Sequence, residues 1–129
     1  MGTITTGPSE PLGCAFKVIR VAPVTLAVGG DIDVTFRFFL GQHSSPDQEI
    51  IISFMLEHAQ DLELYVSMND VDYSRAYLPG PERVVQQVLS KAGLSGTNEL
   101  TFTVGRGSFS FSNLVIWYYT SAFREGPVR

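Results

Sequence analysis

The chain has 129 residues, of which 44% are hydrophobic, and a formal net charge of −4. This length corresponds to one domain with its own core, and the hydrophobic content excludes a disordered chain. The basic residues are scattered singly, so we expect no nucleic-acid partner. No apolar run approaches the length of a membrane span, so we expect no membrane partner either.

The two ends of the chain are rich in Gly, Pro and polar residues. We interpret 1–13 as a flexible N-terminal arm and 121–129 as a C-terminal tail, which leaves 14–120 as the folded domain. The beginning has neither the basic region nor the apolar segment of a signal peptide, which predicts a cytoplasmic protein. We expect Cys14, the single cysteine, to be a small buried residue at the start of a strand.

Between the ends, the dominant hydrophobic period is two, which is typical of half-buried strands. AFKVIRV from residue 15 is a weak example, whereas DIDVTFRF from residue 31, LELYVSM from residue 62 and NELTFTV from residue 98 alternate without a fault. The alternation resumes after the short sequence GRG at 105–107. We therefore predict a hairpin over 98–119 with its turn at GRG.

Two stretches are ambiguous. Residues 45–60 begin with a plausible helix cap at Ser45, but the β-branched run at 50–52 favours a strand. Residues 81–92 have apolar side chains at helical spacing, and here strand and helix both remain open. We predict strands in both, because the neighbouring strands supply a sheet that each can join.

About eight short strands, separated by turns, then fill the folded domain. This count and spacing predict an all-β fold, namely an antiparallel β-sandwich and most simply a jelly roll.

One segment supports that fold by resemblance. Residues 94–119 resemble the closing hairpin of galactose-binding-like jelly-roll domains, a group that includes carbohydrate-binding modules, and residues 61–80 resemble the middle of such domains. The residues that carry the first resemblance are Gly96, Asn98, Leu100, Phe102, Gly105, Gly107, Phe111 and Tyr118. The resemblance to these domains implies a jelly-roll fold and a carbohydrate-binding or lectin-like role. Neither a ligand-binding aromatic pair nor a structural calcium loop can be matched residue by residue.

The polar stretch MNDVDYSR at 68–75 is the candidate ligand site. Asn and Asp make turns on their own, their oxygens also suit calcium, and tyrosine rings beside forked polar groups suit a sugar. Of these, we predict a turn that also holds a carbohydrate, and we expect neither a metal site nor a cofactor. The proposed ligand-binding residues are Asn69, Asp70, Asp72, Tyr73, Arg75 and Tyr77.

Several strands are apolar on both sides, although a sandwich strand needs only one apolar face. This surplus predicts an interface with a second copy or another protein, formed by Phe39, Ile51, Trp117 and Tyr119. No nucleophile elbow, metal-type histidine spacing or phosphate loop is present, so we expect a binding protein and not an enzyme. The alternative to carbohydrate binding is a structural or assembly protein that acts through that apolar sheet face.

Overall fold

The computed structural model describes residues 13–41, 43 and 45–120. The regular elements in this part of the chain are seven antiparallel strands. They are β1 (Gly13–Arg20), β2 (Val24–Ala27), β3 (Asp33–Phe39), β4 (Ile50–Met68), β5 (Val71–Tyr77), β6 (Arg83–Leu89) and β7 (Thr97–Thr120). The predicted arm and tail lie outside the described residues, except for Gly13.

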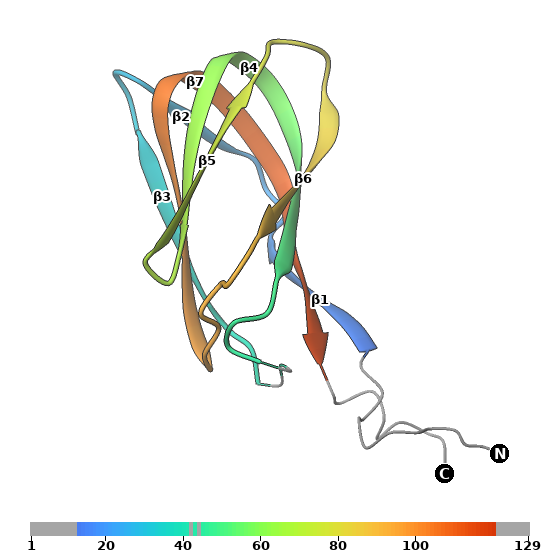
Figure 1. The fold of residues 1–129 in the computed structure, drawn as a ribbon. Helices are drawn as coiled ribbons and strands as arrows, with labels where there is room; N and C mark the ends of the chain where they lie inside the picture. Colours follow the sequence, from blue (N-terminus) through green and yellow to red (C-terminus); the bar gives the residue numbers. More distant parts are fainter. Residues whose placement is uncertain (1–12, 42, 44, 121–129) are drawn as a thin grey trace, which may run out of the picture.

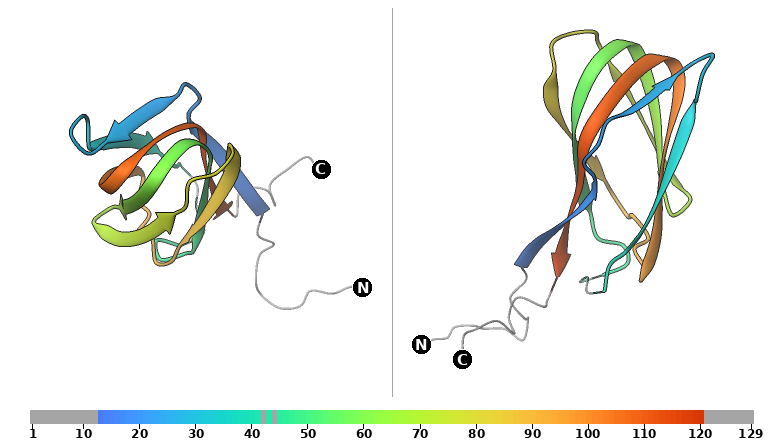
Figure 2. Two further views of the ribbon diagram at one scale, coloured as in Figure 1. Left: turned by 90° about the horizontal axis from the view of Figure 1, so that it is seen from above. Right: turned by 180° about the vertical axis from the view of Figure 1, so that it is seen from behind.

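The two long strands, β4 and β7, run side by side through both layers of a sandwich (Figure 1). The first half of β4 pairs with β6 and its second half with β5. The first half of β7 pairs with β3, and its second half pairs with β2 and then β1, which lies beside the end of β7 in Figure 2. One layer therefore contains β3, β7, β4 and β5, and the other contains β1, β2, β7, β4 and β6. This confirms the predicted all-β antiparallel sandwich.

Both long strands bend at the same level as they pass from one layer to the other. Gly107 of β7 has a φ of 79°, and a Cβ there would overlap the carbonyl oxygen of Gln60 and lie 2.6 Å from that of Asp61. On β4, His58 and Asp61 also have positive φ, and the pairing register shifts around them. The glycine thus permits a close backbone contact within a continuous strand.

The prediction of a hairpin over 98–119 is therefore wrong, because β7 continues through GRG. The ambiguous stretches are strands, as predicted, in β4 and β6. The strands predicted within 45–60 and at 62–68 are likewise one strand, β4. These two mergers, in β7 and β4, together with β2, which was not predicted, give seven strands in the described residues in place of about eight. Cys14 lies on a strand but is exposed, since its side chain is on the outward side of β1.

The inward side chains of both layers form one core, which confirms the alternation read from the sequence. At its centre, the Phe102 and Phe111 rings lie 4.9 Å apart, and the Phe54 and Phe102 rings lie 5.5 Å apart. All three side chains are fully buried. Close packing of large rings makes the core rigid, so each outer face of the sandwich is a fixed surface.

Candidate functional site

The sequence MNDVDYSR forms the tip of the β4–β5 hairpin. Met68 lies opposite Val71, and the two residues between them, Asn69 and Asp70, have φ values of 51° and 71°. Two consecutive positive φ values in a two-residue loop are typical of a type I′ turn, for which Asn and Asp are favoured. The predicted turn is confirmed.

The Asn69 side chain is directed at the protein. Its Nδ2 donates hydrogen bonds to the Gly93 carbonyl (2.9 Å) and to Asn98 Oδ1 (2.8 Å). Its Oδ1 accepts a hydrogen bond of 2.8 Å from the Glu99 backbone N–H. Asn69 thus joins the hairpin tip to the chain that leads into β7.

The remaining predicted site residues are divided between the two sides of β5. Tyr73, Arg75 and Tyr77 share one side, opposite the buried residues of β4. The Tyr73 hydroxyl donates to the Ser90 carbonyl (2.6 Å), and the Tyr77 hydroxyl donates to Gln87 Oε1 (3.2 Å). Burial raises the pKa of both tyrosines, although nearby arginines oppose this for Tyr77. Asp72 is exposed on the other side of the strand.

The Arg75 guanidinium lies 5.8 Å from the centre of the Tyr77 ring, within the range of a cation–π contact. The Tyr77 side chain itself is only 8% exposed. The structure therefore places Tyr73, Arg75 and Tyr77 on one side of β5 and Asp72 on the other, and of the six predicted residues only Asp72 and Tyr73 line a common hollow.

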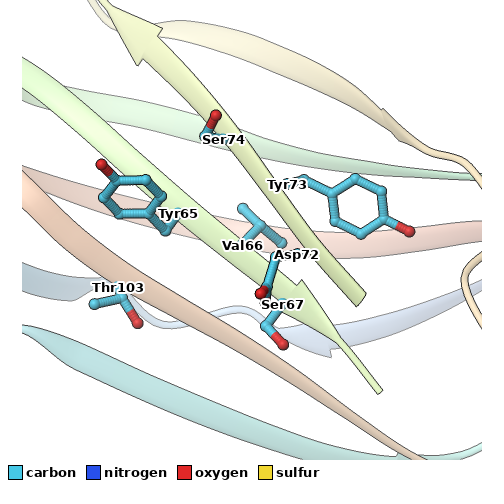
Figure 3. A pocket seen from close by; sticks show the side chains of 7 residues that line it. All are labelled: Tyr65, Val66, Ser67, Asp72, Tyr73, Ser74 and Thr103. Carbon is cyan, nitrogen blue, oxygen red and sulfur yellow. The ribbon is translucent and has the colours of Figure 1, made fainter. Parts of the chain in front are cut away.

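A hollow of about 500 Å³ lies over β4, β5 and β7 (Figure 3). It is lined by Tyr65, Val66, Ser67, Asp72, Tyr73, Ser74 and Thr103. Ser74 and Thr103 lie opposite Tyr65 on either side, and Asp72 lies opposite Ser67. Figure 3 shows the rings of Tyr65 and Tyr73 directed away from each other. We name the outer side of these strands the hydroxyl face, defined by Tyr65, Ser67, Asp72, Ser74 and Thr103.

The Tyr65 ring has a fixed place on the hydroxyl face. It packs against Gly105 of β7, where any Cβ would overlap the ring. Its hydroxyl donates a hydrogen bond of 3.0 Å to Glu63 Oε1, and this bond, together with the Glu63 charge, raises the pKa of Tyr65. The side chain nevertheless remains 44% exposed. Tyr65 therefore presents an oriented aromatic surface to the hollow.

Sequence reasoning included Asp72 and Tyr73 but missed the rest of this lining. Tyr65 and Ser67 occupy the outward positions of LELYVSM, and Thr103 occupies an outward position of NELTFTV. The alternation marked them as outward residues, but their proximity depends on the pairing of β4 with β5 and β7. That register was the missing information.

A second surface lies on the opposite outer side of the sandwich, over β1, β7, β4 and β6. We name it the apolar face, and it consists of Phe16, Val18, Ile51, Met55, Val84, Val88, Val115, Trp117 and Tyr119. Three of the predicted interface residues, Ile51, Trp117 and Tyr119, lie on it together. Phe39 does not, because it lies at the end of β3 in the other layer.

Among the described residues, no group of three or more His, Cys, Asp or Glu side chains is arranged to hold a metal ion. The same residues include no helix long and apolar enough to cross a membrane.

No protein-family model and no curated protein matches the sequence. Among solved structures, dimeric latent PorU from Porphyromonas gingivalis matches 88% of this chain with a TM-score of 0.55 and 13% identity. A CBM4 structure matches 64% with a TM-score of 0.43 and 9% identity. The carbohydrate-binding module CBM36 in complex with calcium and xylotriose matches 84% with a TM-score of 0.45 and 7% identity.

This chain spans 14% of the PorU chain, 59% of the CBM4 chain and 99% of the CBM36 chain. At such low identities a structural match concerns the fold and not the function. Carbohydrate-binding modules are thus among the solved structures that this chain resembles, as the resemblance of residues 61–80 and 94–119 implied.

Proposed function

We propose that this chain is a non-catalytic carbohydrate-binding domain whose ligand lies in the hollow on the hydroxyl face. One observation carries the proposal: the Tyr65 ring is held against Gly105 and stays open to solvent, and hydroxyl and carboxylate groups surround it. A fixed ring needs little reordering when a ligand arrives, so less of the binding free energy is lost.

The chemistry of the lining suits a sugar. One face of a pyranose ring is apolar and can cover the exposed surface of Tyr65, while its hydroxyls both donate and accept hydrogen bonds. Ser67, Ser74 and Thr103 offer groups of the same double character, and Asp72 offers two acceptor oxygens. A mostly apolar hollow with a few convergent polar groups is typical of small-ligand sites, and this volume is within their usual range.

The same lining supports binding without catalysis. Most glycoside hydrolases use a pair of carboxyl groups on either side of the cleaved bond. Among the residues that line the hollow, Asp72 is the single carboxylate. The lining also includes no Lys or Arg, which favours neutral sugars over anionic ones.

Affinity gel electrophoresis with xylan, mannan, galactan and β-glucan tests the proposal, followed by calorimetry with oligosaccharides of the polymer that retards the protein most. We expect Tyr65→Ala and Asp72→Ala each to weaken binding about tenfold, which corresponds to ~1.4 kcal/mol. Melting curves of both variants verify that they remain folded.

Phe39→Ala is the matched control. Phe39 is an exposed aromatic residue on the same layer, but it lies opposite Thr97, six residues before Thr103 on β7, and does not line the hollow. We expect it to bind as the wild type does. The proposal fails if none of the four polymers retards the wild type, or if Tyr65→Ala binds unchanged.

A further inference from the structure

We infer that the apolar face is a self-association surface, through which two copies of this chain pack sheet against sheet as a dimer. This goes beyond the proposed carbohydrate binding, because the apolar face and the hydroxyl face lie on opposite outer sides of the sandwich.

The central row of this surface is apolar across four strands. Phe16 lies opposite Trp117, Trp117 opposite Ile51, and Ile51 opposite Val88. Phe16 is 59% exposed, Val88 52% and Trp117 37%. The outward side of a sandwich strand is normally polar, and contiguous apolar patches of this kind are typical of interaction sites.

The polarity and geometry of the face favour a protein partner over a sugar. The indole N–H of Trp117 already donates a 3.0 Å hydrogen bond to Ser53 Oγ. Gln86 lies opposite Ser53, and on this side of β6 it is the polar residue between Val84 and Val88. The Phe16 and Trp117 rings are inclined by 41° to each other, so they form no common plane on which a sugar chain could stack.

The absence of charge from the centre of the face permits a second copy as the partner. Two identical chains of net charge −4 repel each other, but the residues of the central row and of the row Val18, Val115, Ser53 and Gln86 are all uncharged. Two copies that meet along these two rows bring no carboxylate or ammonium group into them, and Glu49 lies at the edge of the face beside the hollow near Trp117. The same face on both copies is what a twofold dimer requires.

The size of the surface is also adequate. Counting ~200 Å² for a fully exposed aromatic side chain, the exposed parts of the rings and valines amount to roughly 600 Å². A stable interface buries about 800 Å² per partner, so the polar rim must supply the rest. A hollow of about 80 Å³, lined mainly by apolar residues that include Trp117, Tyr119 and Val88 and by Glu49 at its edge, gives the exposed Phe16 of the second copy a place to insert.

Sedimentation equilibrium between about 1 μM and 1 mM tests the inference, together with the fluorescence of Trp117, the single tryptophan. We expect the mass to rise towards that of a dimer, with a parallel blue shift of Trp117 emission as the indole leaves water. Phe16→Glu and Val88→Glu each place two carboxylates in the dimer interface, so we expect each to raise the dissociation constant by roughly 100-fold or more.

Phe39→Glu is the control, because Phe39 is 62% exposed on an edge strand of the other layer. It should dimerise as the wild type does. The inference is overturned if the wild type keeps the mass of one chain at every concentration, which would assign the face to a different partner. It is equally overturned if both glutamate variants remain folded dimers, or if Phe39→Glu dissociates as they do.

Discussion

At the scale of single residues, two glycines have different tasks although both have positive φ. Gly107, with a φ of 79°, faces the backbone carbonyls of Gln60 and Asp61 on the neighbouring strand. Gly29, with a φ of 94°, has open space where a Cβ would be. Of these two positions, only Gly107 would expose an introduced side chain both to an unfavourable backbone conformation and to a rigid neighbouring strand.

We therefore predict unequal costs for the same substitution. Gly29→Ala should lower the free energy of unfolding by about 1–2 kcal/mol, the cost of an alanine in this backbone region. Gly107→Ala should cost more than about 3 kcal/mol or prevent folding, because the two long strands must separate at their bend. Urea denaturation followed by Trp117 fluorescence measures both, and equal values would contradict the role given to Gly107.

At the scale of elements, the β4–β5 hairpin is held in place through its turn. Replacing Asn69 by glycine keeps the left-handed backbone possible but removes the side-chain bonds to Gly93, Asn98 and Glu99, and a longer one to the Ala92 carbonyl. We expect Asn69→Gly to lower the free energy of unfolding by about 2–3 kcal/mol, since the lost bonds also leave the Glu99 N–H without its side-chain acceptor.

Asp70→Gly is the matched control for this prediction. Asp70 has a φ of 71° in the same turn and is exposed. Its replacement should change the free energy of unfolding by less than about 0.5 kcal/mol in the same urea titration. If both variants lose the same amount, the turn conformation decides hairpin stability and the bonds of Asn69 do not.

The elements also show what the sequence could and could not predict. Alternation identified the inward residues of β3, β4 and β7, because burial of one face imposes a period of two. It could not reveal that β7 continues through GRG, since the bend depends on the approach of β4, which is distant in sequence. Asp72 was predicted at the site, but Tyr65 and Thr103 lie beside it only because of the strand pairing.

The strand β2 was not predicted, because its four residues are too few for a periodic signal.

At the scale of the whole molecule, the two surfaces face in opposite directions. A dimer joined through the apolar faces would carry its hydroxyl faces on its two outer sides. The two sites of such a dimer cannot both bind one flat surface, but they can bind two separate polysaccharide chains. The dimer is therefore expected to cross-link a soluble polymer and not to gain avidity on a solid one, because avidity needs both sites to engage together.

Turbidity of a soluble polysaccharide, chosen as the polymer that the wild type binds best, tests this arrangement. The wild type at dimer-forming concentration should produce turbidity that a short oligosaccharide of the same polymer reverses. Phe16→Glu should bind the oligosaccharide with unchanged affinity in calorimetry but produce no turbidity, because each monomer has one site. Tyr65→Ala should remain a dimer and produce none, because it does not bind. If Phe16→Glu cross-links the polysaccharide as well as the wild type does, each monomer must have two binding sites. Dimerisation through the apolar faces would then not be the cause of cross-linking.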